Sequence, residues 1–156
     1  MSSSAPGARE GGLENEEDHA LDIRVYYEDT DLGGVVYYAN YLKFMERGRT
    51  EWLRGLGVDQ MRLKAEAGLV FVVRRCLIDY LKPARMDDLV TVRTRLTRSR
   101  GASIDLAQRL FLCGRPGEGE PESALLIEAE VRVACIDAQG RPARLPRLLA
   151  DKLATL

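Results

Sequence analysis

The sequence is poor in the side chains that most enzymes use for acid–base and metal chemistry. Its one histidine, His19, lies at the edge of a polar N-terminal segment. Three cysteines, Cys76, Cys113 and Cys135, are an odd number and lack the spacing of a metal site. We therefore expect reduced thiols in the cytoplasm, no metal and no cofactor. Acid–base chemistry then falls to carboxylates, tyrosines, cysteines or backbone dipoles.

Long apolar runs and a strong net charge are also absent. No stretch approaches about 18 consecutive apolar residues and no apolar signal-peptide core opens the chain, so no membrane span is predicted. The first 20 residues hold one base and five acids, whereas the rest holds 22 bases and 19 acids. This mildly basic part suits a small anionic ligand. Nucleic-acid binding usually needs a strongly basic domain and stacking aromatics, and aromatic residues make up only 6%.

The pattern along the chain predicts one domain after a tail. Residues 1–20, rich in Ser, Gly and Glu, are predicted to be a disordered tail, and residues 21–156 a single domain. The expected elements are a strand at 21–27, a helix at about 39–54, a short helix at 59–67, strands at 69–80, 89–98, 103–113 and 124–136, and a Pro-punctuated segment at 141–156 that ends in a short helix. This order predicts an α+β fold in which a curved, five-stranded antiparallel sheet wraps around one long helix.

The long helix shows its buried face in the sequence. Tyr41, Met45, Gly48, Trp52 and Leu56 follow one another at steps of 4, 3, 4 and 4, which places them on one side of a helix. A glycine in mid-helix costs about 1 kcal/mol relative to alanine, so we expect Gly48 to let the sheet approach closely. In the last strand, alternation predicts one inward face made of Leu125, Ile127, Ala129, Val131, Val133 and Cys135.

The segment before this helix holds the candidate chemistry. Asp31 is followed by Gly33 and Gly34 and stands seven residues before the helix begins. A helix N-terminus presents unpaired N–H groups and a partial positive charge, which suit a developing oxyanion. A carboxylate facing such a site can attack an acyl carbon or activate a water molecule. The alternative is structural, because aspartate before two glycines also forms turns.

Several segments together resemble a known family. They are Val25-Tyr26-Tyr27-Glu28-Asp29-Thr30-Asp31-Leu32-Gly33-Gly34-Val35-Val36-Tyr37-Tyr38-Ala39-Asn40-Tyr41, Phe44-Met45-Glu46-Arg47-Gly48-Arg49-Thr50-Glu51, Phe71-Val72-Val73-Arg74-Arg75 and Pro83-Ala84-Arg85-Met86-Asp87-Asp88. They resemble hotdog-fold acyl-CoA thioesterases of the 4-hydroxybenzoyl-CoA thioesterase type, and most closely the bacterial Tol-Pal-associated acyl-CoA thioesterases. The resemblance covers about residues 22–150 in order.

The resemblance implies a hotdog fold that hydrolyses acyl-CoA thioesters to free acid and coenzyme A. It places the catalytic acid, either nucleophile or general base, at Asp31, and the oxyanion donor at the backbone N–H of Tyr38. Tol-Pal-associated members often carry histidine at that second position, so any role of its side chain does not transfer. Hotdog proteins dimerise with active sites at the interface and often form tetramers, so a homodimer or homotetramer is expected. The expected substrate-binding residues are Gly34, Val36, Tyr37, Glu46, Arg100 and Ser103.

Several of these assignments have a structural alternative. Asp29 is interpreted as a loop cap, and Glu46 either orients water or pairs with Arg47 or Arg49. The tyrosines at 37 and 38 line an acyl pocket or a subunit contact. A basic run is either a solvated strand face or a contact for coenzyme A phosphates, for which arginine forks are suited; its members are Arg93, Arg95, Arg98 and Arg100.

Two other functions compete with hydrolysis. A hotdog hydratase or dehydratase typically needs a histidine beside a carboxylate, which the core lacks. A non-catalytic acyl-CoA sensor or scaffold would bind the same ligand without releasing thiol. Acyl carrier protein is a further expected partner, because a basic strand suits its acidic surface.

Overall fold

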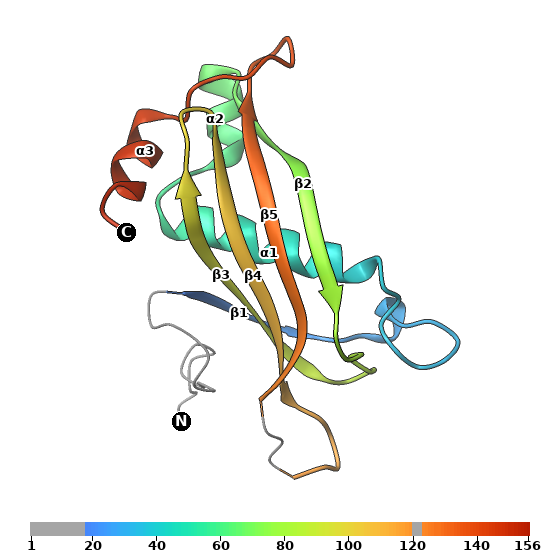
Figure 1. Cartoon of the computed structure of the whole chain (residues 1–156). Helices are drawn as coiled ribbons and strands as arrows, with labels where there is room; N and C mark the ends of the chain where they lie inside the picture. The colour runs from blue at the N-terminus through green and yellow to red at the C-terminus, as the bar shows by residue number, and fades with distance from the viewer. Residues whose placement is uncertain (1–17, 120–122) are drawn as a thin grey trace.

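Five strands and three α-helices make up the computed structural model, which describes residues 18–119 and 123–156 (Figure 1). In chain order they are β1 (His19–Arg24), a 3-10 turn (Tyr27–Asp29), α1 (Asn40–Gly55), α2 (Gln60–Ala67), β2 (Val70–Tyr80), β3 (Leu89–Ser99), β4 (Ser103–Gly114), β5 (Ala124–Ile136) and α3 (Arg147–Leu153). The predicted number and order of the main elements are confirmed.

The strands form one antiparallel sheet in the order β1-β3-β4-β5-β2. β3, β4 and β5 follow one another as a meander, and β1 and β2 form its two edges. Figure 1 shows the curved sheet with α1 lying across one face, while α2 and α3 lie toward its upper end. The predicted α+β layout is therefore confirmed.

α1 packs on the sheet through the face that its periodicity predicts. Tyr41, Met45, Gly48 and Trp52 are buried, and Phe44 and Leu53 widen this face. A Cβ added to Gly48 would lie 2.6 Å from Val92 Cγ1, and 3.2 Å from the side chains of Thr94 and Gln108. The expected close approach of helix and sheet at Gly48 is confirmed.

The first strand lies earlier in the chain than predicted. His19 and Ala20, assigned to the tail from composition, pair with Thr94 and Arg93 of β3. The partner strand supplies this pairing, which the polar composition of the segment does not reveal. At the other end, β1 stops at Arg24, whereas the predicted strand continued to Tyr27, which instead begins the 3-10 turn. The rest of the predicted tail, residues 1–17, lies outside the described residues.

A β-bulge changes the predicted inward face of β5. Leu110 pairs with Ile127 and Phe111 pairs with Leu125, which leaves Leu126 as an extra residue in β5. Leu126 is buried and Leu125 only partly so, hence the prediction of Leu125 on the inward face is wrong. The Leu126 carbonyl accepts from the N–H groups of Leu81 and Lys82, which ties the bulge to the segment after β2.

The two short helices agree with their sequence signals. The Asp59 side chain accepts from the Arg62 N–H and caps α2. α3 packs through Leu149 and Leu153. Among residues 18–119 and 123–156, no helix has both the length and the apolar character needed to cross a membrane.

Candidate active site

Asp31 forms a tight turn at the tip of the loop that leads into α1. Its Oδ1 accepts from the Gly33 N–H (2.8 Å), and its carbonyl accepts from the Gly34 N–H (3.0 Å). Gly34 has a φ of 82°, which favours glycine. The turn-forming interpretation of Asp31 is thus confirmed. The turn also orients the exposed carboxylate and leaves Oδ2 without a donor from the described residues.

The loop folds back as a short hairpin that packs against the segment after β2. The Asp31 N–H donates to the Val35 carbonyl (2.9 Å), and the Val36 N–H donates to the Ala84 carbonyl (2.9 Å). Val35 also forms a β-bridge with Arg85. Val36 and Ala84 are buried, so the contact between them is part of the core, although Asp31 itself is exposed.

The first turn of α1 is hydrogen-bonded to Ala84 as well. The Ala84 N–H donates to Tyr41 Oη (2.9 Å), in the first turn of the helix. Upstream, the Tyr37 N–H donates to the Asp29 carbonyl and the Asn40 N–H to the Tyr37 carbonyl. The Tyr38 N–H, between them, meets no acceptor within the described part of the chain. Ala84 therefore joins the loop that carries Asp31 to the helix end that carries Tyr38.

 A small aromatic pocket opens beside Tyr38. Its volume is about 200 Å³. The pocket beside Tyr38 is lined by Val36, Tyr38, Tyr41, Tyr80, Leu81, Lys82 and Pro83. The Tyr80 ring lies 5.9 Å from that of Tyr38 and 5.8 Å from that of Tyr41. Burial raises the pKa of both Tyr41 and Tyr80, which keeps these two phenols neutral at ordinary pH.

Asp29 is a loop cap, as predicted. Its Oδ2 accepts from the Tyr26 N–H (2.8 Å), and its carbonyl accepts from Asn40 Nδ2 (2.9 Å). An extended backbone would point Asp29 and Asp31 the same way, but the 3-10 turn at Tyr27–Asp29 breaks that alternation. Asp29 therefore fixes the base of the loop.

Glu46 lies one and a half turns into α1 and pairs within the helix. Thr50 Oγ1 donates to Glu46 Oε2 (2.5 Å). Burial lowers the pKa of the Arg49 guanidinium, and the nearby Glu46 carboxylate partly offsets this effect. Glu46 lines the 460 Å³ groove between β1 and α1 together with other acids, Asp22, Glu28, Asp29 and Glu51. The structure does not bring Glu46 into the pocket beside Tyr38.

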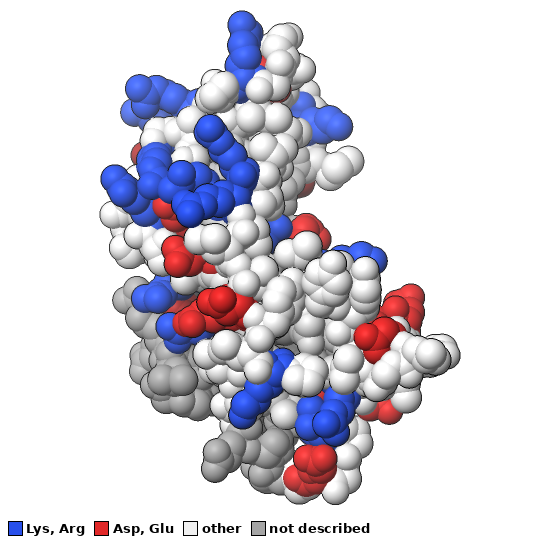
Figure 2. Space-filling model, turned by 45° about the vertical axis from the view of Figure 1, so that its right-hand side comes forward, with Lys and Arg blue, Asp and Glu red and all other residues white. Residues whose placement is uncertain are grey.

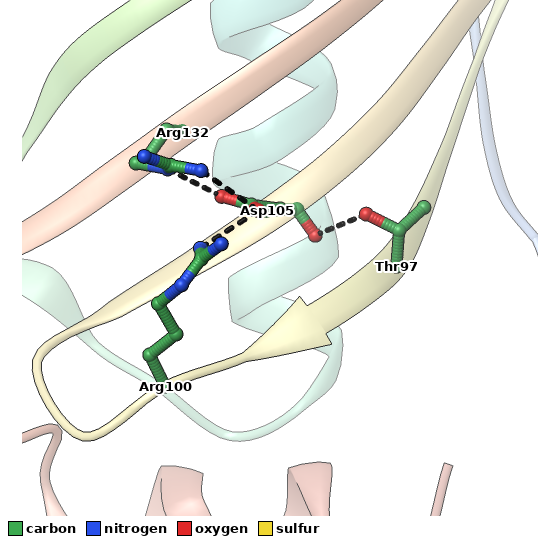
Figure 3. Close-up of polar contacts among 4 residues, drawn as sticks. All are labelled: Thr97, Arg100, Asp105 and Arg132. Carbon is green, nitrogen blue, oxygen red and sulfur yellow. Dashed lines mark hydrogen bonds and ion pairs between the residues drawn. The ribbon is translucent and has the colours of Figure 1, made fainter.

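Arg100 and Ser103 lie at the β3–β4 turn, at the upper end of the sheet, whereas the Asp31 loop is at the lower right (Figure 1). Arg100 Nη1 donates to Asp105 Oδ2 (2.7 Å), and Arg132 donates to both oxygens of the same carboxylate (Figure 3). Hydrogen bonds from Arg132, and then from Arg100, hold the pKa of Asp105 below its usual value. Lys and Arg side chains gather toward this upper end in Figure 2. One chain therefore does not bring Arg100 and Ser103 to Asp31.

The rest of the predicted basic run is mixed in character. Arg93 is buried, although alternation places it on the outer face of β3. Arg95 pairs with Asp18 (3.7 Å), and Arg98 is exposed. Within residues 18–119 and 123–156, no group of three His, Cys, Asp or Glu side chains is placed to hold a metal ion.

Sequence reasoning assigned no role to Ala84, Tyr41 or Tyr80 in the site. Ala84 lies in one of the segments that carry the family resemblance, and that was the available signal. Its role depends on a contact made 43 residues away in the chain, at Tyr41. No local pattern reports such a contact.

Comparison with known proteins agrees with this architecture. The family model described as the thioesterase-like superfamily matches residues 25–153. The acyl-CoA thioester hydrolase YbgC of Escherichia coli O6:H1 is 45% identical over 126 residues, which are 80% of this chain and 87% of that protein. A probable thioesterase from Bartonella henselae superposes with a TM-score of 0.72 at 40% identity, covering 83% of this chain and 99% of that one.

A more distant structure shares the fold alone. It is a mutant 4-hydroxybenzoyl-CoA thioesterase in complex with 4-hydroxybenzoyl-CoA, which has a TM-score of 0.77 at 20% identity and covers 88% of this chain and 96% of that one. The sheet order, the helix that it covers and the matched residues lead to one assignment. The chain is a hotdog-fold protein that belongs to the thioesterase-like superfamily.

Proposed function

We propose that this chain hydrolyses acyl-CoA thioesters to free acid and coenzyme A, with Asp31 as nucleophile or general base and the Tyr38 N–H as oxyanion donor. The observation that supports the proposal is that Ala84 is hydrogen-bonded both to the loop, at Val36, and to the start of α1, at Tyr41. It ties the turn that orients the Asp31 carboxylate to the helix start where the Tyr38 N–H meets no acceptor in the described part of the chain.

The geometry supports two forms of the same reaction. The thioester carbonyl oxygen accepts from the Tyr38 N–H, and the positive end of the α1 dipole stabilises the charge that develops on it. Asp31 then either attacks the carbonyl carbon, giving a mixed anhydride that water hydrolyses, or removes a proton from the attacking water. In both forms the C–S bond breaks and coenzyme A leaves as a thiolate, which needs no strong acid.

The 200 Å³ pocket is the proposed place for the start of the acyl group. Val36 and Tyr38 contribute to its lining, Gly34 shapes the turn before it, and the Tyr37 ring packs 5.1 Å from that of Tyr38. Apolar and aromatic walls suit an acyl group, and the neutral phenols add no charge.

Arg100 and Ser103 fit the proposal only in an oligomer. Since they lie at the other end of the sheet, contact with the phosphates of a coenzyme A bound at Asp31 requires a second copy of the chain. The free edge of β2 exposes apolar side chains, including Val73 (48%) and Leu77 (48%), and an apolar edge favours pairing. This edge supports the proposed homodimer, or a homotetramer built from it, and light scattering measures which of the two forms in solution.

Two further expectations belong to the same proposal. Acyl carrier protein is the alternative carrier, and a pull-down with wild type and Arg98→Glu tests it, because reversal of this exposed charge weakens contact with an acidic surface. A cytoplasmic location remains a prediction, which cell fractionation checks.

Thiol release from a panel of acyl-CoAs tests the activity and the site together. Asp31→Asn keeps the turn acceptor but removes the charge, so we expect a loss of about 100-fold or more in turnover. The matched control is Asp137→Asn, because Asp137 Oδ1 accepts from the Gln139 N–H in a similar turn away from the site. Turnover unaffected by Asp31→Asn would remove the catalytic assignment. Tight acyl-CoA binding without turnover in wild type would favour a sensor or scaffold.

A further inference from the structure

Residues 84–88, which contact the loop and the helix start of the proposed active site, are held by a buried ion pair. Asp88 is fully buried, and Arg115, just after β4, donates to it through Nε (2.9 Å to Oδ1) and Nη2 (2.9 Å to Oδ2). The Arg115 side chain is 19% exposed. A two-point arginine–carboxylate contact fixes both position and orientation, unlike a single hydrogen bond.

Asp88 uses the same carboxylate to shape the turn that follows Ala84. Its Oδ2 also accepts from the Arg85 N–H (2.7 Å). Its N–H donates to the Arg85 carbonyl (3.0 Å), and its own carbonyl accepts from the Val25 N–H (2.9 Å). At the centre of the turn, Asp87 adopts a φ of 72°, a backbone conformation that a residue with a side chain holds only when its surroundings impose it.

From this turn the hydrogen bonds lead directly to both halves of the proposed site. Arg85 bridges Val35, and Ala84 bonds to Val36 on one side and to Tyr41 on the other. The charge of Asp88 also acts on Tyr41, since it contributes to the raised pKa of that phenol. The path from Arg115 to the Asp31 loop therefore runs through named contacts without a gap.

We propose that Arg115 is a positioning residue for thioester hydrolysis: through Asp88 it holds residues 84–88, and thereby the Asp31 loop and the start of α1, in register. Arg115 touches neither substrate nor the reacting atoms. Loss of its contact displaces the carboxylate relative to the Tyr38 N–H, and a misplacement of about 1 Å can cost about 100-fold in rate. Substrate binding depends on the pocket walls and is affected less. The inference rests on the proposed function only for its kinetic readout.

Arg115→Ala tests the proposal through kinetics and chemical rescue. We expect kcat to fall by about 10-fold or more while KM changes by less than about twofold, because positioning acts on the reacting geometry. Guanidinium chloride at low millimolar concentration should restore part of kcat by filling the vacated place beside Asp88, and sodium chloride or urea should not. Arg141→Ala is the matched control, because Arg141 pairs with Asp137 in another hairpin. It should neither slow the enzyme nor respond to guanidinium.

A second variant and a second measurement protect the test against simple unfolding. Arg115→Lys keeps the charge and one hydrogen bond, so its kcat should lie between those of wild type and Arg115→Ala. Amide hydrogen exchange at Val36 and Ala84 should accelerate in Arg115→Ala more than at residues in the middle of β4 and β5. Unchanged kcat with unchanged exchange at Val36 would overturn the proposal. Since exchange needs no substrate, it tests this inference even if wild type hydrolyses no thioester.

Discussion

Replacing Gly48 by alanine should destabilise the protein, although alanine is the better helix former. The added methyl would stand 2.6 Å from Val92 Cγ1, about 1 Å inside the favourable carbon–carbon separation of about 3.5–4.0 Å. Val92 is buried and β-branched, so its side chain has little freedom to move. Overpacking costs about 1–3 kcal/mol, and the gain in helix propensity returns about 1 kcal/mol. A separation of 2.6 Å places the cost in the upper half of that range, about 2–3 kcal/mol, so we expect a net loss of about 1–2 kcal/mol in the free energy of unfolding.

Urea denaturation followed by the fluorescence of Trp52, the one tryptophan, measures this loss. Protein concentration is held constant, because the stability of an oligomer depends on it. Gly55→Ala in the same helix is the matched control, since a Cβ there meets nothing within 4 Å. It should leave stability unchanged or raise it by up to about 1 kcal/mol. If Gly48→Ala were as stable as wild type, the close approach of α1 to β3 would not constrain the fold as argued.

Two further predictions concern His19, which is partly buried, and the buried Gln108. Burial lowers the pKa of His19 below its ordinary value of 6.5 and Glu51 raises it in part, so the single histidine should titrate below 6.5 by NMR. Its contribution to stability is then present above pH 6.5 and lost as pH falls toward the folded-state pKa, a slope that His19→Gln should remove. Gln108→Leu should cost about 1–3 kcal/mol in urea denaturation, because Gln108 Nε2 donates to the Met45 carbonyl and Oε1 accepts from Arg49; a loss below about 0.5 kcal/mol would contradict this network.

Local patterns predict the elements well, and contacts between distant residues escape them. The spacing of the apolar residues around Gly48 is enough to place α1 and its buried face. The turn at Asp31 is also local, since it involves Gly33 and Gly34 alone. The bulge at Leu126 depends on how β4 pairs with β5, and alternation within β5 cannot show it.

The candidate site also has a part that the sequence predicts and a part that it does not. Its proposed reacting groups lie within one short loop, and the sequence names them. The hydrogen bond between Ala84 and Tyr41 and the ion pair between Asp88 and Arg115 join residues 27 or more positions apart. Such contacts are determined by topology and packing, so a single sequence gives no direct sign of them.

The strand order also bears on how the chain is made. β1 and β2 are the first described strands to leave the ribosome, but they lie at opposite edges of the sheet and pair with β3 and β5. Until β3 has been synthesised, the apolar face of α1 has no sheet to cover. β2 has no partner until β5 has been synthesised, because it pairs with residues 127–136. The sheet is therefore completed only after β5 has been synthesised, and the apolar surfaces of the earlier elements stay exposed to aggregation until then.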